Sequence, residues 1–188
     1  NGQIEIILTG DTFDDCLQEA LAYTAANNMT FIPPFDDYRI IEGQATVGVE
    51  IIEDEPEIDL AIIPIGGGGI AAGVGNYLKS VNPNIKIIGV EPAGAPSMTE
   101  ALKAGKPVSL PEINRFVDGA AVKRIGELTF KLCKEILEKV LLLQEAKASR
   151  TSLKLYNKDA IVVEPAGALS IAALDFCKEE IKGKKIVC

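Results

Sequence analysis

Four consecutive glycines, residues 66–69, are the part of this sequence best suited to chemistry. They follow the apolar run "LAIIPI" and precede "IAAGVGNYLK", so they stand between an expected strand and an expected helix. Without Cβ atoms, their N–H groups can approach an anion closely, and the following helix adds unpaired N–H groups and the positive end of its dipole. Because one or two glycines would suffice for a turn, the run predicts an anion site that suits a phosphate group.

Two kinds of phosphate ligand fit this local pattern. A Walker loop requires Gly-Lys-Ser/Thr after the glycines, and Ile-Ala-Ala stands there instead, which disfavours a nucleoside triphosphate. Gly66, Gly68 and Ala71 fit the dinucleotide pattern G-x-G-x-x-A. Glu91 ends the next expected strand, near the place of a ribose-binding acid. The local sequence therefore leaves a dinucleotide and a single phosphate ester equally open.

Composition and charge exclude several other functions. The chain has 188 residues, of which 47% are hydrophobic, so a filled core is expected and disorder is not. A net charge of −8 without a basic cluster argues against nucleic acid. With no histidine, catalysis by an imidazole base is excluded.

The cysteines and the hydropathy indicate a cytoplasmic protein. Four scattered cysteines form no C-x-x-C, and we interpret them as buried or half-buried thiols in a reducing cytoplasm. No segment reaches the length of a membrane span, and no signal peptide is visible.

The elements that position the glycines alternate between apolar strands and amphipathic helices. Strands are expected at residues 4–8, 30–35, 60–65, 85–90, 140–144 and from 185, and helices at 12–27, 37–51, 70–81, 97–104, 125–137, 145–157 and 166–181. This alternation predicts an α/β fold, a three-layer, doubly wound parallel sheet covered on both faces. Ligands bind at the carboxyl ends of such strands, where the glycines lie.

Both ends of the sequence suggest a longer protein. The chain begins with Asn1 just before an expected strand and ends with "GKKIVC" in the middle of another. Natural domains seldom end within an apolar strand, so we expect an internal or C-terminal fragment with an incomplete sheet.

Several long motifs carry a resemblance to a known family. "TGDTFDD", "PPFDD", "EGQATVGVEI", "GGGGIAAGVGNYLK", "VEPAGA", "FVDGAAVKRIGELTF" and "VVEPAGALSIAALD" occur in an order and spacing that resemble the threonine dehydratases (threonine ammonia-lyases). These are fold-type II pyridoxal-phosphate enzymes, like serine racemase and the tryptophan synthase β chain. The resemblance runs along the whole chain. It implies that residues 1–35 are a remnant of the small N-terminal subdomain and that residues 36–188 belong to the large domain, truncated at its last strand.

The resemblance also implies where the cofactor lies. The phosphate of pyridoxal 5'-phosphate would be wrapped by the glycines and the next N–H group, the Gly119 loop would lie along the cofactor, and Glu164 would sit near its pyridine ring. The implied cofactor-binding residues are Gly66, Gly67, Gly68, Gly69, Ile70, Gly119 and Glu164.

A cation site is implied by the first of two "EPAGA" segments, residues 91–95. It matches the place where serine-racemase-like members bind a cation through a glutamate side chain and a backbone carbonyl, here Glu91 and Ala95. Ser97 stands where serine racemase has an acid, so a weak or monovalent site is favoured over a divalent one. The alternative interpretation of Glu91 is a capping or surface carboxylate.

The reactive residues of the family are absent from this chain. Its members join the cofactor to a lysine in a motif like S-F-K-x-R-G, expected upstream of this chain. The one S-x-K here ends in Lys154 and lacks the Arg-Gly, so we interpret it as a solvated helix residue. Because the lysine motif is missing, we expect no catalytic residue in the chain and no activity from it alone. The chain also differs from its relatives at Pro33, the first position of a segment where they read His-Pro-Phe.

The expected function of the parent enzyme is α,β-elimination of L-threonine, and of L-serine, to 2-oxo acid and ammonia. For threonine the product is 2-oxobutanoate, in isoleucine biosynthesis or threonine catabolism. We expect a cytoplasmic homo-oligomer, in a short form without a regulatory domain. The alternatives are a serine racemase or another fold-type II enzyme, an NAD(P)-binding oxidoreductase that uses Glu91, and a non-catalytic fragment.

Overall fold

The computed structural model describes residues 4–188 of the chain. It divides into two compact units, Asn1–Pro33 and Pro34–Cys188. The division lies two residues before the boundary expected from the sequence. The assignment of the first unit to a small subdomain stays a prediction.

The described part of the first unit contains one helix, α1 (Phe13–Ala26), which begins where the sequence predicts it. Thr12 and Asp15 form a capping box, in which the Thr12 side chain accepts a hydrogen bond from the Asp15 N–H at 3.1 Å. The predicted strands at residues 4–8 and 30–35 are wrong. Leu8 is 92% exposed, and the described part of this unit offers no second strand for pairing. In residues 30–35, the consecutive prolines Pro33 and Pro34 lack the N–H groups that hydrogen bonds between strands need.

A parallel sheet of four strands forms the middle layer of the second unit, which confirms the predicted α/β fold. The strand order is β3-β2-β1-β4, and every neighbouring pair is parallel. The strands are β1 (Leu60–Pro64), β2 (Lys86–Pro92), β3 (Leu137–Leu143) and β4 (Ile186–Val187).

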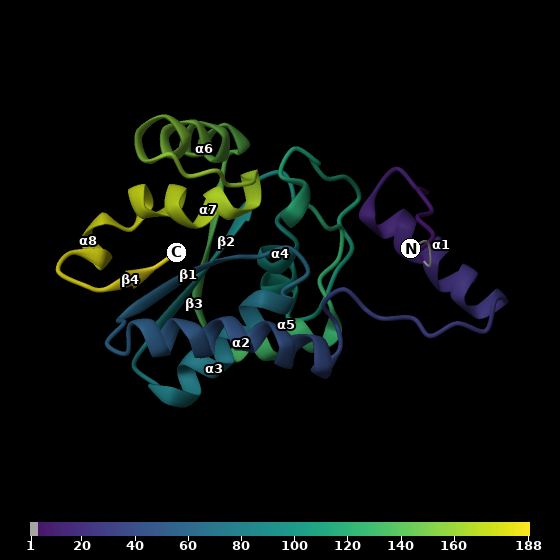
Figure 1. Cartoon of the computed structure of the whole chain (residues 1–188), viewed down its shortest axis with the longest axis horizontal. Helices are drawn as coiled ribbons and strands as arrows, with labels where there is room; N and C mark the ends of the chain where they lie inside the picture. The colour runs from purple at the N-terminus through teal and green to yellow at the C-terminus, as the bar shows by residue number, and fades with distance from the viewer. Residues whose placement is uncertain (1–3) are drawn as a thin grey trace. The chain divides into compact units, whose positions relative to one another are not determined.

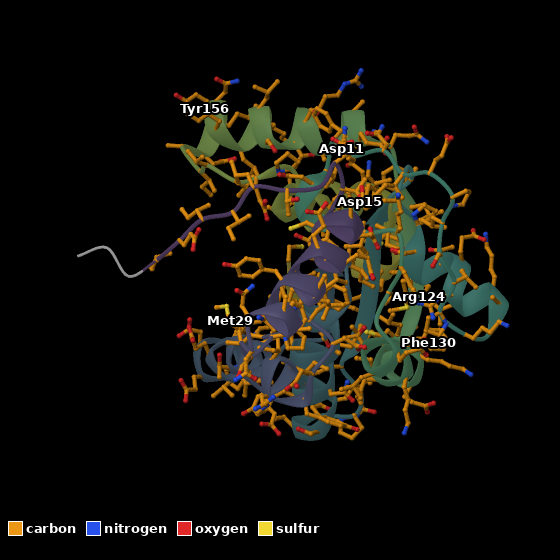
Figure 2. The ribbon with its side chains drawn as sticks, turned by 90° about the vertical axis from the view of Figure 1, so that its right-hand side faces the viewer. Asp11, Asp15, Met29, Arg124, Phe130 and Tyr156 are labelled. Carbon is orange, nitrogen blue, oxygen red and sulfur yellow. The ribbon has the colours of Figure 1, made fainter. Side chains whose placement is uncertain are left out.

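Helices cover both faces of this sheet (Figure 1). One face carries α2 (Tyr38–Asp54), α3 (Gly69–Val81), α4 (Ser97–Ala104) and α5 (Glu127–Ile136), and the other carries α6 (Glu145–Asp159) and α7 (Pro165–Ala173). The outer side of α6 carries exposed side chains such as Tyr156 (Figure 2). Across residues 4–188, every helix is too short or too polar to span a membrane.

The central strand β1 shows why the sequence contains unbroken apolar runs. Ala61 and Ile63 pack among α2, α3 and α5, whereas Leu60 and Ile62 pack against α7 on the opposite face. All four are at most 6% exposed, so neither face of the strand tolerates polar residues.

The single helix predicted for residues 166–181 is wrong, because the chain turns twice there. After α7 come a 3-10 turn, η2 (Leu174–Phe176), and a short helix, α8 (Lys178–Ile181). Between them, Cys177 has a non-helical backbone (φ −120°, ψ 18°). Its side chain stays in the α7 side of the core at 1% exposure, and the turn leads the chain back toward β4.

The contact between α2 and α3 gives a test of the fold. A Cβ on Gly73 would overlap the Ile41 carbonyl oxygen and lie 2.8 Å from the Ala45 nitrogen, both in the backbone of α2. Gly73→Ala is expected to lower the free energy of unfolding by about 1–3 kcal/mol because two backbones must separate. Gly43→Ala, in open space within α2, should raise it by about 0.5–1 kcal/mol. Urea unfolding of the two variants measures this difference, and equal midpoints would contradict the described packing.

Candidate functional site

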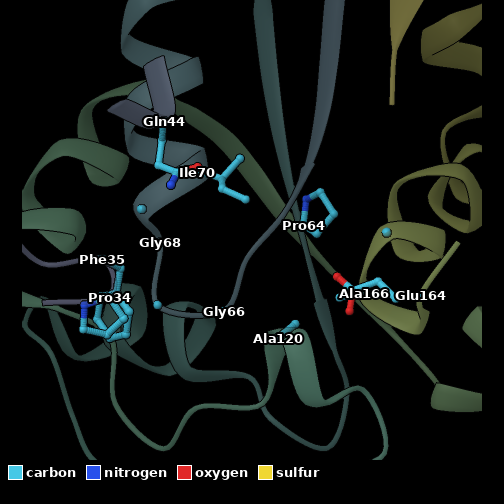
Figure 3. Close-up of a pocket in the computed structure, with 14 residues that line it drawn as sticks. Pro34, Phe35, Gln44, Pro64, Gly66, Gly68, Ile70, Ala120, Glu164 and Ala166 are labelled. Carbon is cyan, nitrogen blue, oxygen red and sulfur yellow. The ribbon is translucent and has the colours of Figure 1, made fainter. Parts of the chain in front are cut away.

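A cavity of approximately 290 Å³ opens at the carboxyl end of β1, within the second unit (Figure 3). Its lining includes the seven residues predicted from the sequence to surround a cofactor. They are Gly66, Gly67, Gly68, Gly69, Ile70, Gly119 and Glu164. Pro34, Phe35 and Gln44 were not predicted and also line it.

Unpaired backbone N–H groups border this cavity. Across the described residues, the N–H groups of Gly66, Gly67 and Gly68 donate no hydrogen bond. Gly68 caps α3 with a left-handed backbone (φ +91°), and its carbonyl accepts the helix's hydrogen bond from the Ala72 N–H at 2.8 Å. Gly68 has no side chain to cap this helix, and within residues 4–188 no distant side chain takes that role. The loop and the helix N-terminus together therefore offer donors and a positive dipole end to an anion.

The glycines are also required by their close neighbours. A Cβ on Gly67 would overlap the ring of Phe35, and one on Gly69 would lie 3.0 Å from the Phe35 Cβ. A Cβ on Gly66 would lie 3.0 Å from the Cα of Ala120. The loop is thus held between two segments distant in sequence, and larger residues would displace one of them.

Helix α5 supports the glycine loop from behind. Thr129 donates from Oγ1 to the Gly67 carbonyl at 2.7 Å, and the Cys133 thiol lies 3.7 Å from the Gly68 carbonyl. Burial raises the pKa of Cys133 to about 12, so this thiol stays protonated and can donate. The Asp36 carboxylate caps α5 by accepting from the N–H groups of three consecutive residues, Glu127, Leu128 and Thr129.

Sequence reasoning missed Asp36 and Thr129. The residue before α5 is Gly126, which has no side chain to cap a helix. Its capping group comes instead from a position 91 residues away from Glu127. The absence of a local capping side chain at Gly126 was the one signal in the sequence that a distant side chain caps α5.

Glu164 and Gly119 lie side by side at another wall of the cavity. Glu164 is the N-cap residue of α7, its side chain makes no capping hydrogen bond, and it is exposed. A Cβ on Gly119 would lie 3.0 Å from Glu164 Oε2. Glu164 and Ala166 lie across the cavity from Gly68 (Figure 3). The carboxylate is therefore available to a ligand in the cavity.

Glu91, in the first "EPAGA", has a different environment. It is fully buried at the end of β2, where its carboxylate accepts from the Met98 N–H at 2.6 Å, the Thr99 N–H at 2.9 Å and the Thr99 hydroxyl at 2.7 Å. Glu91 thus caps α4, in line with the alternative interpretation of this residue. It does not line the cavity, which argues against a role as a ribose-binding acid.

The predicted cation ligands share this buried region. Ala95 and Ser97 are both 0% exposed, and Ser97 Oγ is a buried atom that finds no hydrogen-bond partner among residues 4–188. Among residues 4–188 no group of three His, Cys, Asp or Glu side chains could hold a metal. One carboxylate with a hydroxyl and a carbonyl suits a weak monovalent ion better than a divalent one. The cation site stays a prediction.

Within the part of the chain that the structure describes, no lysine lines the cavity. Lys154 is exposed on α6, as expected from the sequence, and takes no part in the site.

The capping role of Glu91 can be tested by removing one acceptor. Burial raises the pKa of Glu91 to about 7, so the carboxylate is ionised at pH 8. Because this pKa lies above the ordinary value for glutamate, the free energy of unfolding should fall as the pH rises to about 7, and Glu91→Gln, which cannot ionise, should remove most of this fall. Glu100→Gln, on the same helix but in an exposed ion pair with Lys103, should change it by less than about 1 kcal/mol. Denaturant unfolding at about pH 5 and about pH 8 measures both variants, and a pH dependence that the Glu91 variant keeps would contradict the described burial of this carboxylate.

The sequence is similar to that of known enzymes along nearly its whole length. Residues 2–188 match the family described as pyridoxal-phosphate dependent enzyme. The biosynthetic L-threonine dehydratase of Halalkalibacterium halodurans is 57% identical over 186 residues. That match covers 98% of this chain and 45% of the relative, so the chain spans less than half of that enzyme's length.

Solved structures agree with this match. The processed form of threonine deaminase isoform 2 from Solanum lycopersicum is 40% identical, with a TM-score of 0.89 over 96% of this chain and 53% of that chain. Maize serine racemase is 30% identical, with a TM-score of 0.88 over 97% of this chain and 57% of that chain. With residues 2–188 matched and the fold shared, the chain belongs to the family of pyridoxal-phosphate-dependent enzymes.

Proposed function

We propose that this chain supplies the cofactor-phosphate site of an enzyme that deaminates L-threonine by α,β-elimination. The observation that carries the proposal is the set of unpaired N–H groups of Gly66, Gly67 and Gly68 beside the uncapped start of α3. A phosphate monoester provides the acceptors and the negative charge that these groups lack. The 57% identity to a relative named as a threonine dehydratase supports threonine as the substrate.

The residues of the cavity have separate tasks in this proposal. The N–H groups of residues 66–69 and of Ile70 hold the phosphate, and the dipole of α3 stabilises its charge. Gly119 leaves room for the cofactor to lie along the loop, and the Glu164 carboxylate orients the pyridine ring. The ring of Phe35 forms one wall of the cavity beside the glycines. When bound, pyridoxal phosphate supplies the electron sink that makes the substrate's α-proton removable.

The base and the group that attaches the cofactor belong outside this chain in the proposal. The lining contains no lysine, and the chain covers 45% of the length of its relative. We assign the reactive lysine and the loop that binds the substrate carboxylate to the remainder of the enzyme. The homo-oligomeric state, the cytoplasmic location and the cation held by Glu91, Ala95 and Ser97 belong to the same proposal.

Two substrates remain within reach of this site. L-Serine has the same β-hydroxyl leaving group, so we propose it as a second substrate. Serine racemization is the alternative function, supported by the maize enzyme's structure, and its lower identity of 30% makes it the weaker candidate. Full-length enzyme with pyridoxal phosphate and L-threonine should form 2-oxobutanoate and ammonia. Formation of D-amino acid without 2-oxo acid would overturn the proposal in favour of racemization.

The chain alone is expected to bind phosphate weakly and to show no turnover. Without a lysine in the cavity, it cannot retain the cofactor covalently. The measurement compares 2-oxobutanoate formation by the 188-residue chain with that by free pyridoxal phosphate. A rate above the free cofactor would show that a group in this chain acts as the base.

A pair of glycines with similar backbones tests the role of the loop. Gly68 and Gly105 both have left-handed φ angles, +91° and +70°, but Gly105 lies away from the cavity with nothing within 4 Å of an added Cβ. In the full-length enzyme, Gly68→Ala should raise the dissociation constant of pyridoxal phosphate about tenfold or more, because strain of about 1–2 kcal/mol turns the donor away. Gly105→Ala should carry similar strain and leave that constant unchanged. Equal affinities in the two variants would contradict the assignment.

A further inference from the structure

Thr129 makes a hydrogen bond that its own helix does not require. It lies in the first turn of α5 and is 0% exposed. A threonine in a helix commonly satisfies its hydroxyl on a carbonyl three or four residues earlier. Here the Gly126 carbonyl is 3.4 Å from Oγ1, whereas the Gly67 carbonyl, 62 residues away, is at 2.7 Å. The hydroxyl therefore bonds preferentially to the glycine loop.

This bond fixes the direction of a peptide group. In a planar trans peptide, the C=O and the following N–H point in opposite directions. Since the Gly67 carbonyl points to Thr129, the N–H of Gly68 points away from α5. That N–H has no acceptor among the described residues, and Gly67 and Gly68 both line the cavity. By holding the Gly67 carbonyl on the α5 side of the loop, the Thr129 hydroxyl thus sets the Gly68 N–H on the opposite side.

The position of Thr129 is itself fixed by a second segment. Asp36 accepts from the Thr129 N–H at 3.1 Å and from the Leu128 N–H at 2.9 Å through the same oxygen, Oδ1. The ring of the adjacent Phe35 lies where a Cβ on Gly67 would be. The segment that closes the cavity wall therefore also holds the start of α5, and with it the hydroxyl.

We propose that Thr129 is a positioning residue for the cofactor phosphate: its hydroxyl holds the Gly67–Gly68 peptide so that the Gly68 N–H faces the phosphate. This inference rests on the proposed function, because the phosphate is that of pyridoxal phosphate. It concerns the phosphate alone. Loss of the hydroxyl should weaken binding of pyridoxal phosphate and leave binding of pyridoxal, which lacks the phosphate, unchanged.

The test measures the dissociation constants of both compounds on the cofactor-free full-length enzyme, from the change in protein fluorescence. Thr129→Val keeps the shape and removes the donor. It should raise the constant for pyridoxal phosphate about tenfold, because the phosphate must then hold the peptide in an orientation that leaves the Gly67 carbonyl unpaired. The constant for pyridoxal should change less than about twofold. Thr129→Ser keeps the hydroxyl and should restore wild-type affinity for the phosphate form. The phosphorus NMR shift of the bound cofactor should change in the valine variant and not in the serine variant.

A matched control and a second variant complete the test. Thr46 is exposed on α2 and donates to the Gly43 carbonyl at the same 2.7 Å, so Thr46→Val makes the same substitution at a local helical bond away from the cavity and should leave both constants unchanged. If the valine variant does not fold, Thr129→Ala is measured in the same way, with the same loss of phosphate preference expected.

The possible results separate the two claims. If the wild type does not prefer pyridoxal phosphate over pyridoxal, the proposed function and this inference both fail. If the wild type shows the preference and the Thr129 variants keep it, the inference alone is overturned. Equal weakening of both compounds also overturns it, because it would show that Thr129 supports the fold in general.

Discussion

The N–H groups of residues 66–68 need acceptors that the described chain does not supply. Proteins pair nearly all their buried backbone donors, because an unpaired one costs about 1–3 kcal/mol. A loop can keep such groups unpaired only where water or a ligand reaches them. Burial of β1 on both faces fixes the loop at the strand's carboxyl end, and packing of α3 against α2 fixes the helix start. The cavity is where these two requirements meet.

The parts of the site that follow from local pattern were predictable. The apolar run of β1, the four glycines and the helical spacing of α3 lie next to one another in sequence, so their geometry follows from chain connectivity. The cap of α5 by Asp36 does not, because Gly126 only indicates that a capping group is missing. The predicted strand at residues 4–8 failed for a related reason. An apolar pattern predicts a strand, but only a partner segment can make one, and the described part of its unit has none.

The two "EPAGA" segments show how far a repeated motif can mislead. In the first, α4 begins only at Ser97, so the chain continues past Glu91 and folds back to let its carboxylate cap the helix. In the second, Pro165 is already the first residue of α7, and Glu164 becomes an N-cap whose side chain is left over for the cavity. The same five residues thus give one buried structural carboxylate and one available to a ligand. The position of the next helix decides between these roles.

The described residues that line the cavity supply no positively charged side chain for a phosphate. Among the residues that line it, Glu164 is the one ionisable side chain, and it is acidic. In a chain of net charge −8, attraction for a phosphate must therefore come from neutral backbone donors and the dipole of α3. Backbone N–H groups do not ionise near neutral pH, so they hold an anion without acting as an acid or a base. In the proposed enzyme the base comes from another segment, and Thr129, Asp36 and the glycines serve binding alone.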